Sequence, residues 1–471
     1  MRLLVLLRQS FLLLLFFSVN ISAHKLMAQC GTSFLKNIGN GNEIGFTVAY
    51  SQMENVVYAC GTTHDSVIIV RLDQDFNIDW IRKLDIIPGR PEYVNGMIVD
   101  KDGKIVIAGT IATLENEGYG FICRYDPQSN TTMWSREVRG SLDGVCSALI
   151  ELPDADQYLF SYNPNSPNNA QLFLFDATTG AIQSQFSKEY GLGSSETISD
   201  IVYYNGTLYG VGRFTDGPST AEMRTTLISL DPLTGMPGYT LLGHKPASTS
   251  ARLYGFDLVI DQDTIYYVSC GNESSASISD TKVYVQKATL DGQIIWLKEY
   301  NFPGQNDWVN EIVKTGDGFA ILGSNRIAPS DIIIFKINTA GDVLWGRKFD
   351  RDQNDNTVSV GGVSSQMVAV GDEIIFTAYS EQSGSYNMII GGLSTDGDIK
   401  DDCDIIETID IPVREVKNKT YYFVNTEVGD ETPLLLTPTP QTAIDIDLEE
   451  ENSCVNGTVQ TQIEATICSG S

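Results

Sequence analysis

The chain has 471 residues, 42% of them hydrophobic, so it is long enough to bury a large core. Its 60 acidic and 31 basic residues give a formal net charge of −29 at pH 7. Such a surface repels polyanions, which argues against nucleic acid and anionic membranes as partners. With only 3 histidines, the chain has little material for a Ser-His-Asp triad or a histidine zinc site.

The N-terminus predicts a secretory signal peptide over residues 1–28. Arg2 and Arg8 are followed by the apolar run Phe11–Phe17, and small and polar residues lead to Ala28. The run is shorter than the ~20 apolar residues that a permanent span requires, so no integral membrane span is expected. We therefore expect a secreted protein, extracellular or at the cell surface after cleavage.

A block of roughly fifty residues then recurs along the chain, the range of four-stranded propeller blades. The segments are short runs rich in Val, Ile, Tyr and Phe, separated by Gly, Asn and Asp, as strands require. The clearest copy covers Asp331–Phe349. The last apolar residue of the third strand marks seven copies, at Leu72, Tyr125, Phe175, Leu230, Leu290, Ile337 and Leu393.

The outermost strand of a copy has an aromatic residue followed two positions later by a basic one, as in Trp345-Gly-Arg347. The seventh copy lacks such a strand, whereas Phe34–Ile38 near the N-terminus fits it. We therefore expect Phe34–Ile38 to complete the last blade and remove the exposed sheet edges. The predicted fold class is all-β: a seven-bladed β-propeller over residues 29–400, closed by an N-terminal strand in the last blade.

Residues 401–471 form an acidic, Pro- and Thr-containing tail. This composition predicts a linker, or a small β module that is incomplete or partly ordered. Whether the chain is a fragment of a longer surface protein stays open.

All eight cysteines lie at or after position 30, and an even count in an exported chain permits disulfides. Cys30 and Cys403 flank the two chain ends that meet in the last blade, which makes them the candidate disulfide. The alternative is two unrelated thiols. Cys123 and Cys146 lie in predicted strands and are interpreted as small buried hydrophobic residues.

The repeat resembles known propellers. Copies with Asp/Asn-x-x-Gly-x-x-x-Trp-x-Arg/Lys, such as Asn338–Arg347, resemble those of large secreted surface proteins of gliding bacteria, many exported by a type IX-like route. The resemblance covers about Cys30–Leu393 and implies an exported propeller beside adhesive modules. The turns Asp176–Gly180 and Asp231–Gly235 also look like the tryptophan-docking repeats of quinoprotein dehydrogenases. Those enzymes use eight blades, so this second likeness implies shape alone and no quinone cofactor.

One set of equivalent positions, one on the inner strand of each copy, contains the candidate functional residues; we call this set the column. Alignment of the copies places Thr47, Met97, Ala148, Asp200, Asp257, Glu311 and Gln366 at equivalent positions. The three acids, Asp200, Asp257 and Glu311, come from adjacent copies and could hold Ca²⁺ or bind sugar hydroxyls around the axis. They could equally be solvated groups at a channel mouth. The repeating tryptophans are expected to pack between neighbouring blades.

Taken together, the sequence predicts a secreted, non-catalytic binding or structural propeller module of an extracellular or cell-surface protein. Its partner would be a protein or a polysaccharide, bound by variable loops on one rim. No catalytic residue and no cofactor is assigned, and Ca²⁺ is the one metal considered. The alternative is a polysaccharide-active hydrolase or lyase in which the channel acids serve as general acid and base. Ligand identity and oligomeric state stay open.

Overall fold

The computed structural model describes residues 34–452, with short gaps at 42, 64, 113–117, 140–143, 165–168, 184–185, 192–195, 216–222, 244–251, 273–280, 304–305, 326–329, 350–353, 357–365, 383–384, 399–405, 418–420, 431–433, 437–441, 447 and 449. The described residues form strands and turns without an α-helix, so the all-β prediction is confirmed. In this part of the chain no helix is long and apolar enough to cross a bilayer.

The strands follow the sequence copies in order. The first three copies contain β2 (Glu43–Ser51), β3 (Val56–Thr63), β4 (Ser66–Leu72) and β5 (Ile78–Leu84); β6 (Glu92–Val99), β7 (Ile105–Ala112), β8 (Gly118–Asp126) and β9 (Thr131–Arg139); and β10 (Gly144–Leu152), β11 (Gln157–Pro164), β12 (Ala170–Asp176) and β13 (Lys188–Gly191). The fourth and fifth contain β14 (Thr197–Tyr204), β15 (Thr207–Thr215), β16 (Met223–Leu230) and β17 (Pro237–Leu242); and β18 (Arg252–Asp261), β19 (Thr264–Asn272), β20 (Lys282–Thr289) and β21 (Ile294–Tyr300). The remaining copies contain β22 (Asp307–Lys314), β23 (Phe319–Asn325), β24 (Ile332–Ile337) and β25 (Val343–Phe349); and β26 (Asn354–Asn356), β27 (Met367–Val370), β28 (Glu373–Gln382) and β29 (Ser385–Ser394).

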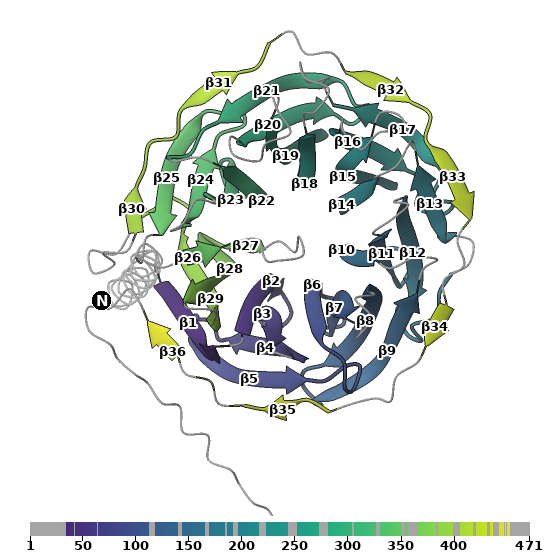
Figure 1. Ribbon diagram of the computed structural model, residues 1–471, viewed down its shortest axis with the longest axis vertical. Coiled ribbons are helices and arrows are strands. Elements are labelled where there is room, and N and C mark those ends of the chain that lie inside the picture. The colour runs from purple at the N-terminus through teal and green to yellow at the C-terminus, as the bar shows by residue number, and fades with distance from the viewer. Residues whose placement is uncertain are drawn as a thin grey trace, which may run out of the picture.

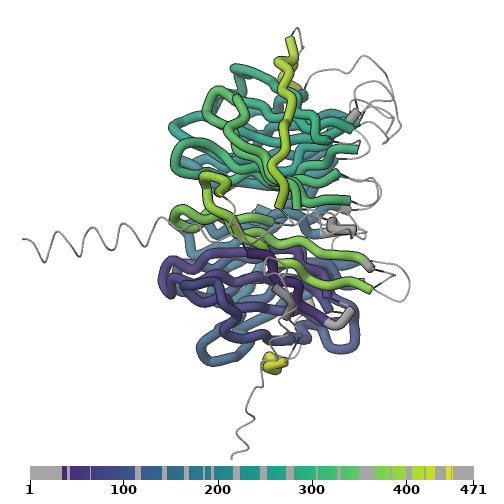
Figure 2. Tube along the Cα trace, turned by 90° about the vertical axis from the view of Figure 1, so that its left-hand side faces the viewer, coloured from purple at the N-terminus to yellow at the C-terminus, as the bar shows by residue number. Residues whose placement is uncertain are grey.

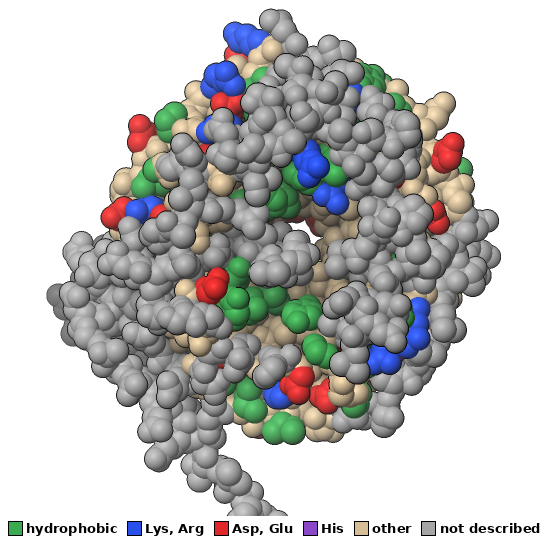
Figure 3. Space-filling view, viewed as in Figure 1, with side chains coloured by type: hydrophobic (Ala, Val, Ile, Leu, Met, Phe, Trp, Pro, Cys, Tyr) green, Lys and Arg blue, Asp and Glu red, His purple; other side chains and the backbone are tan. Residues whose placement is uncertain are grey.

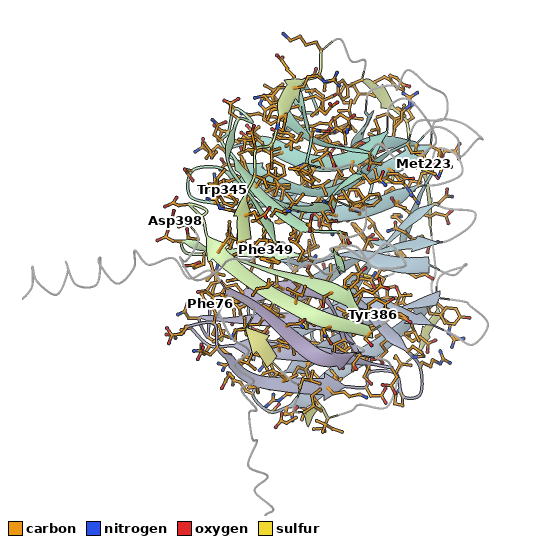
Figure 4. The ribbon with its side chains drawn as sticks, turned by 60° about the vertical axis from the view of Figure 1, so that its left-hand side comes forward. Phe76, Met223, Trp345, Phe349, Tyr386 and Asp398 are labelled. Atoms are coloured by element: carbon orange, nitrogen blue, oxygen red, sulfur yellow. The ribbon has the colours of Figure 1, made fainter. Side chains whose placement is uncertain are left out.

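The copies stand around a common axis, with the first strand of each at the centre and the last at the periphery (Figure 1). Seen from the side, the sheets stack around the ring with their turns on two opposite faces (Figure 2). Phe76 and Asp398 lie toward one of these faces, and Met223 and Tyr386 toward the other (Figure 4). This arrangement is a β-propeller, as predicted.

The prediction of seven separate blades is wrong. The described strands form five blade-sized sheets, each of five or six strands, and one continuous ten-stranded sheet. That large sheet contains both the fourth and the fifth sequence copies. A single parallel pair, Met223 with Arg252, joins β16 to β18 and merges them. This pairing depends on how closely β16 and β18 approach each other in space, and the spacing of the repeats along the sequence does not predict that distance.

The predicted N-terminal closure is confirmed. Strand β1 (Phe34–Gly41) pairs antiparallel with β29, from Phe34 opposite Gly392 to Gly41 opposite Tyr386. Phe34, Leu35 and Ile38 are buried, so the closing strand also contributes to the core. The first described strand of the chain therefore completes the sheet that the last copy leaves unfinished.

The described part of the C-terminal tail forms short strands that add to the sheets of the ring. Seven short strands follow the last copy: β30 (Ile406–Thr408), β31 (Val413–Glu415), β32 (Tyr422–Val424), β33 (Glu427–Asp430), β34 (Leu434–Leu436), β35 (Ile444–Asp445) and β36 (Glu450–Asn452). They pair antiparallel with β25, β21, β17, β13, β9, β5 and β1 in turn. We call residues 406–452 the belt, because they encircle the ring in the reverse order of the copies (Figure 1).

The repeating tryptophans dock onto the turn of the following copy, as predicted. Trp134 on β9 donates a 2.8 Å hydrogen bond from Nε1 to the Ala177 carbonyl, and its ring lies against Gly180. The basic residue two positions later, Arg136, donates to the Gly180 carbonyl at 3.0 Å. Trp345 repeats the geometry by donating to the Thr395 carbonyl at 3.1 Å. The aromatic-x-basic pattern therefore joins neighbouring copies, because both side chains bind the same turn of the next copy.

Cys60, Cys123, Cys146 and Cys270 are buried free thiols, which confirms the interpretation of Cys123 and Cys146 as core residues. The candidate disulfide between Cys30 and Cys403 lies outside the described residues and stays a prediction. The predicted signal peptide, residues 1–28, lies outside them as well.

Candidate functional site

The innermost strands share a local irregularity that shapes the axis of the ring. In β2, β6, β10, β14, β18 and β22 the ladder to the second strand shifts register at a matching point, for example between Gly255 and Asp257. Such a bulge leaves a residue unpaired and re-aims the side chains beside it. The column of acids found in the sequence follows directly after this bulge. In the second and third copies the register places Gly96 and Leu149, rather than Met97 and Ala148, at the position after the bulge.

A cavity of about 430 Å³ lies between the inner strands, within the ~300–1,000 Å³ range of small-molecule pockets. Asp200, Asp257 and Glu311 line it, together with the apolar side chains of Met97 and Leu149 from other copies. The space-filling view shows an opening at the centre of one face (Figure 3). The structure thus brings the three sequence-predicted acids to one channel.

Each acid accepts a hydrogen bond from the backbone of the next copy. The Leu258 N–H donates to Asp200 over 3.4 Å. The Ile312 N–H donates to Asp257 at 2.6 Å. The Met367 N–H donates to Glu311 at 2.7 Å. The column therefore links neighbouring inner strands, a structural role that the sequence alone did not reveal.

Burial raises the pKa of all three carboxyls. It is the largest cause for Asp257, whose pKa is held well above its usual range also by the negative charges of Asp200 and Glu311. The pKa of Glu311 is raised well above its usual range as well, and that of Asp200 is raised. The Asp200 and Asp257 carboxyls also act on each other, which raises the pKa of Asp257 and lowers that of Asp200.

The described residues contain no group of three or more His, Cys, Asp or Glu side chains placed to hold a metal ion. The Ca²⁺ hypothesis for Asp200, Asp257 and Glu311 stays a prediction. The backbone N–H groups that occupy these oxygens compete with metal coordination. Most of the predicted rim loops lie outside the described residues.

Sequence reasoning missed a basic and aromatic cluster beside the channel. Arg213 follows Gly212 on β15, a position where three other copies have the small hydroxyl residues Thr62, Thr110 and Ser324. This departure of Arg213 from the residue type of the other copies could have pointed to the cluster in the sequence. Arg252 and Tyr254 on β18 complete the cluster together with Trp308 on β22.

These features define the class of protein as a β-propeller with an acid-lined axial channel. No model of a known protein family matches the chain, and no curated protein matches it. Among solved structures it is similar to the polysaccharide lyase Uly1, with 7% identity, a TM-score of 0.41, and coverage of 76% of this chain and 98% of that one. It is also similar to a europium-containing methanol dehydrogenase (12% identity, TM-score 0.41, 74% and 81% covered). A third similar structure is the β-propeller domain of the Trilobed protease from Pyrococcus furiosus, with 11% identity, a TM-score of 0.39, and coverage of 74% of this chain and 95% of that one.

Proposed function

We propose that the protein is a secreted, non-catalytic binding module of an extracellular or cell-surface protein. Its partner, a polysaccharide or a protein, binds at the face onto which the axial channel opens. One observation carries this proposal: Asp200, Asp257 and Glu311 each accept a backbone N–H from the next copy while they line a preformed cavity. The acids are thus committed to holding the ring, and the cavity is left as a rigid recess for a ligand. The signal-like sequence over residues 1–28 supports export.

The alternative is a polysaccharide-active hydrolase or lyase. It is favoured by the placement of Asp200 and Asp257 in one cavity and by the raised pKa of Asp257 and of Glu311. A carboxyl that keeps its proton near neutral pH can act as a general acid beside an ionised partner.

One experiment separates the two functions. Asp200→Asn and Glu311→Gln each keep an oxygen that accepts the backbone N–H but cannot exchange a proton near neutral pH. The wild-type chain and both variants are incubated with acidic and neutral polysaccharides, and both retention and newly formed chain ends are measured. The proposal expects retention without new chain ends. New chain ends that disappear in variants with unchanged melting temperature would instead establish the enzyme.

A further inference from the structure

Two arginines of like charge approach each other beside the axial channel. The inner strand β18 lies directly against β15, because Gly255 and Gly212 leave no side chain between the two backbones. A methyl group at Gly255 would stand 2.6 Å from the Gly212 carbonyl oxygen. This close approach brings Arg213 on β15 within electrostatic reach of Arg252 on β18.

The arrangement leaves donors unused. Nε of Arg213 and Nε of Arg252 are both buried and have no hydrogen-bond partner among the described atoms. A buried N–H without an acceptor is costly, and buried polar groups in folded proteins are normally paired. Burial lowers the pKa of Arg213, and the positive charge of Arg252 lowers it further. Tyr254 and, to a smaller extent, Glu196 act on the pKa of Arg213 in the opposite sense. A bound anion would supply an acceptor for the unpaired Nε groups.

Aromatic rings stand next to the guanidinium groups. The Arg213 guanidinium carbon lies 5.1 Å from the centroid of the Tyr254 ring. The Tyr254 ring lies 6.1 Å from that of Trp308, and Phe256 contacts Trp308 edge-on at 5.2 Å. Tyr254, Phe256 and Trp308 are each half-buried. An aromatic wall beside a guanidinium suits a ligand with both an apolar ring face and an anionic substituent.

The position in the ring also fits a ligand that enters from solvent. Met223, the backbone partner of Arg252, points to the face opposite Phe76 and Asp398 (Figure 4). On the face seen in Figure 3, basic and apolar side chains lie together beside the central opening. Deeper in the channel, the described lining includes the carboxyl groups of Asp200, Asp257 and Glu311 and no basic side chain, so an anion finds no cationic partner there. The anionic group is therefore expected at the mouth.

We propose that Arg213, Arg252, Tyr254 and Trp308 form a binding site for an acidic saccharide at the mouth of the channel. The two guanidinium groups bind the carboxylate of a uronate residue, and the aromatic wall packs against its sugar ring. This inference rests on the proposed binding function and names its ligand class. A guanidinium fork matches a carboxylate in geometry and charge, which favours uronates over neutral sugars.

The test uses the full chain and measures its affinity for oligogalacturonate by calorimetry. Arg213→Thr installs the residue that two other copies have, and Arg252→Gln removes the second charge. Loss of a hydrogen bond to a charged group predicts that each variant weakens binding about 10- to 100-fold. Arg252→Lys keeps the charge but loses the fork and should also bind more weakly. Arg414→Gln, on the belt and exposed, is the matched control and should bind as the wild type does.

The outcomes are distinguishable. Affinity for oligogalacturonate that falls with salt, falls in the site variants and is absent for its methyl ester supports the proposal. If the wild type binds but Arg213→Thr and Arg252→Gln bind equally well, the site is wrong while the binding function stands. If a polyglutamate peptide binds as tightly as oligogalacturonate, the ligand is an acidic protein, and the saccharide assignment is overturned. If no acidic or neutral glycan and no acidic peptide binds, both the site and the binding function are contradicted.

Discussion

At the scale of single residues, the protein uses charged and aromatic side chains mainly to join one copy of the repeat to the next. The channel acids accept backbone N–H groups across the boundary, and the tryptophans donate to the following turn. The contacts of Trp134 and Trp345 could be predicted because both residues occupy the same place in the repeat. The role of the acids could not, because it depends on a bulge that only the pairing register reveals.

The raised pKa of Glu311 predicts a specific pH dependence of stability. The folded chain holds this proton to a higher pH than the unfolded chain, whose carboxyl titrates near ~4.3. The stability that the proton contributes is complete below that value and is lost as pH rises through the folded pKa. Glu311→Gln should therefore match the wild type near pH 4.5 and melt at a higher temperature at pH 8.

Asp231→Asn is the control with the opposite trend. A hydrogen bond from the Thr234 backbone lowers the Asp231 pKa, so its stabilisation is present above the unfolded pKa and fades as the solution is acidified. Melting curves between about pH 2.5 and 8.5 measure both variants, since the Asp231 contribution is lost only below its unfolded pKa of ~3.9. If Glu311→Gln tracks the wild type over the whole range, the carboxyl is not perturbed as described.

Gly180 tests the docking of Trp134. Its φ is +65°, and a methyl group there would stand 2.6 Å from the Trp134 ring. Gly206 has a similar φ of +80° but nothing within 4 Å of the added methyl. Left-handed backbone costs an ordinary residue about 1–2 kcal/mol, so Gly206→Ala should lose about that amount in denaturant unfolding. Gly180→Ala should lose clearly more, and equal losses would show that Trp134 does not pack there.

At the scale of elements, the two chain ends differ in how far the sequence could predict them. Phe34–Ile38 was predictable as the closing strand because it matches the outer strands of the other copies. The belt was not, because its strands are only two to four residues long and lack an apolar alternation of their own. These segments form strands because they pair with the exposed outer edge of each sheet, and that edge belongs to another part of the chain. The Met223–Arg252 pair that merges two copies was hidden for a similar reason.

Ile411 tests whether the belt contributes to stability. It is 3% exposed and packs into the cluster that contains Tyr300 and Phe335. Truncation of a buried Ile costs about 2–5 kcal/mol, so Ile411→Ala should lower the free energy of unfolding by an amount in that range. Val413, two residues further along the belt, is 38% exposed, and Val413→Ala should change stability by less than ~0.5 kcal/mol. Similar small losses for both would mean that the belt is only loosely attached.

At the scale of the whole molecule, the ring is closed twice. Strand β1 pairs on its inner side with β29 and on its outer side with β36, so the N-terminal strand lies between two segments from the C-terminal half. The belt also covers the outer edge of every sheet, which blocks edge-to-edge association with other molecules. Composition and repeat spacing were sufficient to predict the propeller. They could not predict the count of separate sheets or this outer layer, because both depend on contacts between distant parts of the chain.

Amide hydrogen exchange in the outer strands tests this account most directly. It is measured for β5, β9, β13, β17, β21, β25 and β1 in the full chain and in a chain that ends after residue 398, which lacks the belt. We expect these outer strands to be protected in the full chain and to exchange much faster in the shortened one, while the second strand of each copy stays protected. Equal protection of the outer strands in both chains would contradict an encircling belt.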